Sequence, residues 1–246
     1  MRKIRIDQLL VEDFGYESRS RARDAILRGC VLIDGKVVKK QGQIVGSQSK
    51  ISIEDEAAQY VSRAALKLKS ALDKTGYSPS GHIALDLGAS TGGFTQVLLE
   101  EGAEKVWCID VGTQQLHPKL IDHPKIRNLE NLNARALTRQ HLEDDTPSFI
   151  VSDLSFISLK LALPPALEIA KAGTYGIFLV KPQFEVGKEN IGKGGIVRDQ
   201  AYASEVSQGI ANWLDEFDNW SVTHFMPSPI TGGDGNVEYL LAARKN

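Results

Sequence analysis

The most constraining feature of this 246-residue chain is a glycine-rich turn between an apolar run and a run that can be helical. The apolar run, residues 83–87, contains Asp86, and the turn of residues 88–93 follows at once. A strand, a tight turn and a helix N-terminus in this order can hold a nucleotide-like cofactor. The turn reads D-x-G-x-x-x-G-G, so it has neither the spacing of a dinucleotide fingerprint nor the lysine of a P-loop.

The rest of the chain after residue 83 alternates between strand-like and helix-like runs, which predicts an α/β fold with a parallel sheet and helices on both faces. The predicted strands are residues 83–87, 105–110, 149–152 and 175–180, and the predicted helices are 95–101, 138–142, 159–172 and 200–216. The tail differs, because runs 221–227 and 237–243 flank the loop 230–236. They predict a β-hairpin that places an antiparallel strand at the end of the sheet.

The second predicted strand ends in Asp110, about 20 residues beyond the first, where a carboxylate can accept hydrogen bonds from ribose hydroxyls. Asn133 follows the expected third strand and is a weaker candidate for the adenine pocket. The turn resembles the first motif of S-adenosylmethionine (SAM) dependent methyltransferases, with Ser90 and Thr91 inside it. The resemblance implies SAM as cofactor and a Rossmann-like fold. The candidate cofactor residues are Asp86, Gly88, Ala89, Ser90, Gly92, Gly93, Phe94, Asp110 and Asn133.

Charge divides the chain unevenly. Residues 1–50 carry 11 Lys/Arg and six Asp/Glu, whereas the whole chain has a net charge of −2. A basic first fifth on an acidic remainder predicts two modules, of which the first faces a polyanion. Residues 4–14 and 18–28 have helical spacing, with Ser18 as a cap and Gly29 as a stop, and Asp34-Gly35 predicts a hairpin.

This first module is similar to the S4-type RNA-binding module over about residues 3–55. The pattern consists of Arg5-x-Asp7-x-Leu9-Leu10, Ser20-Arg21-x-x-x-Ala25, Gly29-x-Val31 and Asp34-Gly35-Lys36. The resemblance implies an α+β domain that binds RNA, and guanidinium groups near a helix start are suited to phosphates. The candidate RNA-binding residues are Arg5, Arg19, Arg21, Arg23, Arg28 and Lys36; the alternative is that the arginines form a solvated helix face.

A short polar stretch, residues 54–59, predicts a linker, and residues 60–72 predict an amphipathic helix capped by Ser62. We therefore expect an S4-like domain with its linker at residues 1–59 and a methyltransferase domain at residues 60–246.

The sequence argues against two of the acceptors to which a methyltransferase could transfer the methyl group: a base amino group and cytosine C5. Related enzymes that methylate base amino groups have an acidic or asparagine residue followed by two prolines and an aromatic residue, and the segment after Asp153 has no proline. Attack on cytosine C5 needs a thiolate, and neither Cys30 nor Cys108 is suitably placed. The remaining groups are Asp153, Lys181 and Glu238 at strand ends, with Lys67 on the preceding helix.

Lys67, Asp153, Lys181 and Glu238 resemble the K-D-K-E tetrad of FtsJ/RrmJ-like ribose 2′-O-methyltransferases. The whole chain is similar to the TlyA family, whose members are described as haemolysin A-like proteins and as 16S/23S rRNA (cytidine-2′-O)-methyltransferases. The segments that carry this similarity are residues 60–68, 86–95, 151–158, 181–185 and 192–199. The resemblance implies rRNA or ribosomal subunits as partners and a catalytic role for the tetrad.

A ribose hydroxyl is a poor nucleophile while protonated, and a lysine can remove its proton only as the neutral amine. A second ammonium and partial burial both favour that form. We expect Lys181 to be the base, Lys67 the second cation, and Asp153 and Glu238 the groups that orient them, with no metal. Residues 184–199 are glycine-rich and predict either a mobile RNA-facing loop or a plain surface loop.

Two cysteines without a metal-binding spacing, no signal sequence and no long apolar run predict a cytoplasmic protein that is not in the membrane. Two other functions remain open: a membrane-active haemolysin, and a non-catalytic RNA-binding ribosome-assembly protein. The sequence does not indicate the oligomeric state or the nucleotide that is modified.

Overall fold

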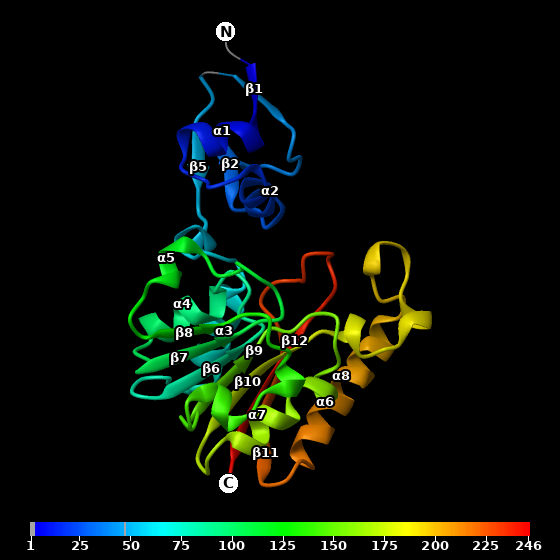
Figure 1. Cartoon of the computed structure of the whole chain (residues 1–246). Helices are drawn as coiled ribbons and strands as arrows, with labels where there is room; N and C mark the ends of the chain where they lie inside the picture. The colour runs from blue at the N-terminus through cyan, green and yellow to red at the C-terminus, as the bar shows by residue number, and fades with distance from the viewer. Residues whose placement is uncertain (1–2, 47) are drawn as a thin grey trace. The chain divides into compact units, whose positions relative to one another are not determined.

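The computed structural model describes residues 3–46 and 48–246, and the chain divides into two compact units, Met1–Tyr60 and Val61–Asn246 (Figure 1). Each unit has a hydrophobic core of its own. The cores are built from the apolar faces that the sequence periodicity indicates.

The first unit combines short helices with two small antiparallel sheets. Its elements are β1 Lys3–Arg5, α1 Ile6–Asp13, α2 Arg19–Leu27, β2 Val31–Ile33, β3 Lys36–Val37, β4 Ile44–Gly46, β5 Ile51–Ile53 and the 3₁₀ helix η1 Glu56–Gln59. One sheet pairs β1 with β4, and the other has the order β3-β2-β5. The Ser18 hydroxyl accepts from the Arg21 amide, and Asp34 and Gly35 both have positive φ, as a tight hairpin requires. The predicted helices and hairpin are thus confirmed.

Two features of this unit differ from the sequence prediction. Strands β1 and β4 were not expected, since three residues are too few to show alternation. The segment 54–59, expected to be a plain linker, contains η1 at Glu56–Gln59, in which Ala57 is buried. The Asp55 carboxylate caps this turn by accepting from the Ala57 amide at 3.0 Å, so side-chain bonds order a segment whose composition is polar.

The second unit is built on a seven-stranded sheet of order β11-β12-β10-β9-β6-β7-β8. The strands are β6 Ile83–Leu87, β7 Lys105–Ile109, β8 Ile126–Leu129, β9 Phe149–Ser152, β10 Tyr175–Val180, β11 Trp220–Pro227 and β12 Tyr239–Lys245. The pairs β10–β9, β9–β6, β6–β7 and β7–β8 are parallel, and β12 runs antiparallel to both of its neighbours. The four predicted strands and the C-terminal hairpin are confirmed.

The antiparallel strand β12 does not lie at the end of the sheet, as the sequence predicted, but between β10 and β11. Residues 240–243 of β12 are fully buried, whereas β11 is mostly half-buried. An apolar strand buries both of its faces only inside a sheet, and the less apolar strand takes the edge.

The helices of the second unit lie on both faces of the sheet (Figure 1). They are α3 Ala65–Thr75, α4 Gly93–Glu100, α5 Pro118–Ile121, α6 Leu159–Ala162, α7 Pro164–Ile169 and α8 Gln200–Asp215, with 3₁₀ helices η2 Ala134–Ala136, η3 Arg139–Leu142, η4 Pro182–Phe184, η5 Lys188–Asn190 and η6 Lys193–Gly195. Helix α3 packs with α4, and α6 packs with α7 and α8.

Helix boundaries account for the remaining differences. Helix α3 begins at Ala65, because the Ser62 hydroxyl accepts from the Ala64 amide in a turn before the helix rather than capping it. The helix predicted at 159–172 breaks into α6 and α7 at Pro164 and ends at Ile169. Residues 139–142 form the 3₁₀ helix η3 rather than an α-helix.

The antiparallel direction of β12 has a consequence for the site. The carboxyl ends of β6, β7, β9 and β10 meet at one edge of the sheet, and β12 begins at that same edge. Residues that follow the parallel strands, and Glu238 just before β12, therefore come together there.

Candidate active site

A cavity of about 1130 Å³ lies at the carboxyl edge of the sheet. Of the predicted cofactor residues, Gly88, Ser90, Asp110 and Asn133 line it, and Asp153 lines it as well. This volume is slightly above the range of about 300–1,000 Å³ that is common for ligand pockets, so a nucleotide-sized ligand has room to fit.

The Asp110 carboxylate ties the turn after β6 to the end of β7. Its two oxygens accept from the amides of Ser90 at 2.8 Å and Gly112 at 2.7 Å. Gly88 and Ser90 have φ of 79° and 48°, so the turn needs the left-handed region at both positions. Each carboxylate oxygen retains acceptor capacity, because it has two lone pairs and one described partner.

The other predicted cofactor residues support the turn from behind. Ala89, Gly92, Gly93 and Phe94 are buried, and none of them lines the cavity. A Cβ on Gly92 would meet Leu116 and Leu120, and a Cβ on Gly93 would lie 2.9 Å from the Ser62 Cβ. These two glycines allow close packing of protein against protein, and their predicted role at the cofactor stays a prediction.

Asp86 also lies behind the turn rather than in the cavity. Its side chain is fully buried, Oδ2 accepts from the Thr95 hydroxyl at 2.7 Å, and Oδ1 has no partner among the described residues. Burial raises the pKa of the Asp86 carboxyl to about 7. The carboxyl therefore supports the turn in an apolar setting, where its protonated form is favoured.

The segment after β8 forms the far wall of the cavity. The Asn133 side chain accepts from the Arg135 amide at 3.0 Å and caps η2, and residues 132–135 all line the cavity. The Glu130 carboxylate instead holds a loop by accepting from the amides of Gln114 and Gln115, and these bonds hold its pKa below the usual range.

The structure brings together the tetrad of Lys67, Asp153, Lys181 and Glu238. The Lys67 Nζ donates to Glu238 Oε2 at 2.6 Å and lies 3.9 Å from Asp153 Oδ2. The Lys181 Nζ lies 2.5 Å from Asp153 Oδ1 and donates to the Ser155 hydroxyl at 2.9 Å. Acid and base thus alternate along one line, Glu238–Lys67–Asp153–Lys181. Lys67 and Glu238 are buried, and Lys181 is the more exposed of the two lysines.

A smaller cavity of about 240 Å³ adjoins the tetrad and is lined by Lys181 and Glu238. Phe156 and Phe184 line both cavities, and their ring centroids are 5.1 Å apart. Phe156 is 91% exposed and has φ of 65°, an unusual conformation for a bulky residue that stores strain at functional sites. Gln183 lines both cavities too, and its Oε1 has no partner among the described residues.

Sequence reasoning missed Phe156 and Gln183 as site residues. Both fall inside segments that the family resemblance identified, but spacing alone gives no sign that their side chains face a cavity.

The glycine-rich segment 184–199 is more ordered than its composition suggested. It contains η5, η6 and an antiparallel bridge between Ile191 and Val197. The buried Asn236 side chain holds it, because Oδ1 accepts from the Val197 amide at 3.0 Å and Nδ2 donates to the Gly195 carbonyl at 2.8 Å. Ile191 and Gly195 thereby form part of the wall of the smaller cavity.

In the first unit, the predicted RNA-binding arginines form two groups that differ in their partners, and the predicted lysine stands apart from both. Arg5, Arg19 and Arg23 surround the buried carboxylate of Asp7 with their own side chains still partly exposed. We call these four residues the Asp7 cluster. Lys36 lies exposed on β3.

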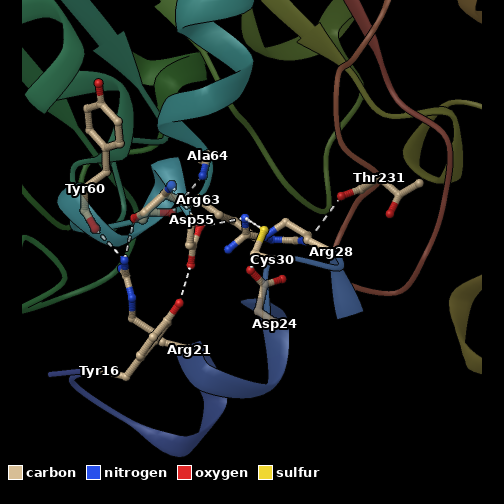
Figure 2. A network of polar contacts seen from close by, with 12 residues as sticks. Tyr16, Arg21, Asp24, Arg28, Cys30, Asp55, Tyr60, Arg63, Ala64 and Thr231 are labelled. Atoms are coloured by element: carbon tan, nitrogen blue, oxygen red, sulfur yellow. Dashed lines mark hydrogen bonds and ion pairs between the residues drawn. The ribbon is translucent and has the colours of Figure 1, made fainter. Parts of the chain in front are cut away.

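Arg21 and Arg28 instead bind the unit's own backbone and carboxylates (Figure 2). Arg21 donates to the carbonyls of Ala57 and Tyr60, at 2.8 and 2.6 Å. Arg28, whose side chain is only 14% exposed, donates to Asp24 and to Asp55, each at 2.8 Å. These two arginines therefore hold residues 55–60 against α2, and their predicted role in RNA binding stays a prediction.

Neither a metal-binding cluster nor a membrane-spanning helix is found among residues 3–46 and 48–246. These residues contain no group of three or more His, Cys, Asp or Glu side chains that could hold a metal ion. Across the same ranges, no helix has the length and apolar character needed to cross a membrane.

The order of strands, the cavity at their carboxyl edge and the antiparallel β12 define the fold of a SAM-dependent methyltransferase. The solved structure of a SAM-dependent methyltransferase from Mesorhizobium loti has the same fold, with a TM-score of 0.53 over 75% of this chain and all of that one. At 15% sequence identity the likeness concerns the fold and nothing more.

The chain belongs to the FtsJ-like methyltransferase family, whose model matches residues 60–245, and it carries an S4 domain matched at residues 4–51. It is 37% identical to hemolysin A of Brachyspira hyodysenteriae over 96% of this chain and 98% of that protein. It is 39% identical to the 16S/23S rRNA (cytidine-2′-O)-methyltransferase TlyA of Mycobacterium tuberculosis over 99% and 90% of the two chains. A solved hemolysin-like structure from Streptococcus thermophilus matches at 38% identity and a TM-score of 0.76, over 100% of this chain and 90% of that one.

Proposed function

We propose that this chain transfers a methyl group from SAM to a ribose 2′-hydroxyl of ribosomal RNA, with a cytidine as the acceptor. In this proposal residues 1–59 form the domain that binds RNA and residues 60–246 form the catalytic domain. The observation that carries it is the line Glu238–Lys67–Asp153–Lys181 beside a cavity of cofactor size. The names of the curated relatives supply the acceptor class.

The residues around the larger cavity fit SAM. Asp110 has free acceptor capacity for ribose hydroxyls, and Gly88, Ser90 and Asn133 line the same cavity. Asp86, Ala89, Gly92, Gly93 and Phe94 would act indirectly, because they set the shape of the turn. When bound, SAM supplies an electron-poor methyl group on a sulfonium sulfur.

The tetrad handles the proton and the orientation of the acceptor. The neutral Lys181 amine would accept the proton of the ribose hydroxyl, and the electron pair of the methyl–sulfur bond that breaks would stay on the sulfur. Asp153 directs the Lys181 Nζ from 2.5 Å, and Glu238 holds the Lys67 ammonium at 2.6 Å beside Asp153. Most of the acceleration would come from holding the hydroxyl in line with the methyl group.

The aromatic pair Phe156 and Phe184 suits the acceptor nucleotide. Single-stranded RNA is commonly bound by unstacked bases on aromatic side chains, at about 1–3 kcal/mol per base. The exposed, strained Phe156 ring lies at the boundary of the two cavities, next to Phe184, where such a base would enter.

The test is methyl transfer from labelled SAM to unmodified 16S and 23S rRNA transcripts and to isolated ribosomal subunits. A 2′-O-methyl group blocks alkaline cleavage of the next phosphodiester bond, so label should appear in alkali-resistant dinucleotides. Label in mononucleotides would show base methylation and overturn the ribose assignment. Lys171→Ala, which changes an exposed lysine beyond α7, is the matched control for Lys181→Ala.

A further inference from the structure

The Asp7 cluster is an unusual arrangement, because one buried carboxylate serves three guanidinium groups. Asp7 lies on α1 with its side chain 0% exposed. Arg5 binds both carboxylate oxygens, at 3.0 and 3.1 Å, while Arg19 and Arg23 on α2 bind Oδ2 at 2.9 and 2.8 Å. A single side chain therefore joins α1, α2 and the last residue of β1.

The charges of the cluster do not balance. Three cations surround one anion, and the arginine side chains are 41–48% exposed while the carboxylate is enclosed. Burial acts to raise the pKa of Asp7, but the hydrogen bonds from Arg5, Arg23 and Arg19 hold it well below the usual range. The carboxylate thus stays ionised, and the cluster presents a surplus of positive charge to solvent.

Donors remain available on the exposed side. A guanidinium has five N–H groups, and the described contacts use two of those on Arg5 and one each on Arg19 and Arg23. The Arg5 guanidinium lies against Gly42, where an added Cβ would come within 2.7–2.9 Å of it. The backbone therefore backs Arg5 from one side, and its other face stays open.

The second arginine group of this unit provides the contrast. Arg28 is almost enclosed between Asp24 and Asp55, so this one guanidinium has two carboxylates beside it. Burial acts to raise the pKa of Asp55, and the Arg28 contact lowers it below its usual range. The contacts of Arg28 with Asp24 and Asp55 stabilise the fold, but they leave no surplus positive charge for an anion.

We propose that Arg5, Arg19 and Arg23 form one preorganised site for the backbone phosphates of folded RNA, and that Asp7 is the positioning residue of that site. This inference rests on the proposed function. Three neighbouring guanidinium groups repel one another and have many rotamers, so ordering them on binding costs conformational entropy. Asp7 removes that cost in advance by fixing all three in the free protein. An acidic residue would therefore strengthen the binding of a polyanion.

The test uses Asp7→Asn, for which two physical accounts predict opposite results. If net charge alone decided affinity, removing an anion would tighten RNA binding. Preorganisation predicts that the full-length variant binds an unmodified 23S rRNA transcript at least tenfold more weakly at 0.15 M salt. The matched control is Asp13→Asn, which removes an exposed carboxylate from the end of α1 and should leave affinity equal or slightly higher.

A second pair of variants keeps the proposal testable if Asp7→Asn does not fold. Arg19→Lys and Arg23→Lys preserve the charge but lose the planar fork, so each should weaken binding severalfold. Arg19→Ala should lower the slope of log affinity against log salt by about 1, as the loss of one phosphate contact requires. The change in RNA affinity should exceed any change in the Kd for SAM, whereas general unfolding would alter both.

The outcomes distinguish failure of the proposed function from failure of the preorganised phosphate site. If wild-type protein fails to bind or methylate rRNA, the proposed function fails. If wild-type protein binds, and folded Asp7→Asn and both lysine variants bind equally well or more tightly, the preorganised site is refuted while the proposed function stands.

Discussion

The Asp7 cluster and the tetrad hold charged side chains in opposite ways. In the Asp7 cluster three arginines share one carboxylate and keep their outer faces exposed, whereas the tetrad sets two lysines against two acids at a largely buried position. Unbalanced, exposed charge is suited to holding a polyanion, and balanced, buried charge is suited to positioning a proton. The predictions below test this contrast.

The largest effect is expected from Lys181→Ala, which removes the proposed base. Methyl transfer should fall by about 10²–10⁴-fold in kcat, the usual contribution of general base catalysis. The Kd for RNA should stay close to that of wild type, because the Asp7 cluster is intact. Single-turnover kinetics with labelled SAM would measure the first quantity, and filter binding the second. Wild-type turnover in this variant would exclude Lys181 as the base.

The buried part of the tetrad should show a non-additive double-mutant cycle. Glu238→Gln alone leaves the Lys67 ammonium without its closest partner and should cost about 3–5 kcal/mol of unfolding free energy. Lys67→Met alone should cost a similar amount. The double variant should cost less than the sum, because no buried charge is then left unpaired. Urea unfolding measures all three, and simple additivity would mean that the two groups are not coupled.

Asp86 is a buried carboxyl that forms no ion pair with any described residue, which makes it a contrast to both clusters. Because its folded-state pKa is about 7, above the ordinary 3.8, the folded state binds the proton more tightly than the unfolded state. The free energy of unfolding should therefore fall as pH rises from about 4 to 7, by about 2–4 kcal/mol from this group.

Asp86→Asn should remove that pH dependence, since the amide oxygen can still accept from Thr95. At pH 8 the variant should be more stable than wild type. Urea unfolding at pH 4.5, 6 and 8 gives the comparison, and parallel curves for the two proteins would contradict the assignment.

The smallest stability effect is expected at Phe156. Substitutions there test whether its ring positions the acceptor nucleotide beside the tetrad. Phe156→Gly relieves a positive φ at an exposed site, so unfolding free energy should rise by about 0.5 kcal/mol after the entropic cost of glycine. The KM for RNA should nevertheless rise severalfold, because the ring is lost.

Phe156→Leu is the matched control, because it keeps the strained backbone and removes only the aromatic ring. It should raise the KM for RNA without a gain in stability. A wild-type KM in both variants would argue that the ring does not contact the acceptor nucleotide.

The sequence was sufficient for features that depend on local pattern. The glycine-rich turn, Asp110 at the end of β7 and the Ser18 cap all follow from short-range spacing. Three members of the tetrad were candidates because they lie at expected strand ends, and the family resemblance then grouped them with Lys67. The structure shows that they converge, and their catalytic role stays a prediction.

The features that were missed depend on contacts between distant parts of the chain. Asp55 and Arg28 are 27 residues apart, and Asn236 and Val197 are 39 residues apart. A polar residue in such a pair looks the same in sequence as a solvated one. The interior place of β12 was missed for a similar reason, since it follows from competition between two strands for the edge of β10.

The contact between Lys67 and Glu238 also makes the site a reporter of complete folding. The two residues are 171 positions apart, and Glu238 reaches Lys67 only when β12 has inserted between β10 and β11. A contact of such long range forms late, because the closure entropy of the intervening chain must be overcome first. A chain that has folded everything except β12 would still have the turn that holds the cofactor but would lack half of the buried ion pair. Catalysis should therefore disappear before cofactor binding does when the last strand comes loose.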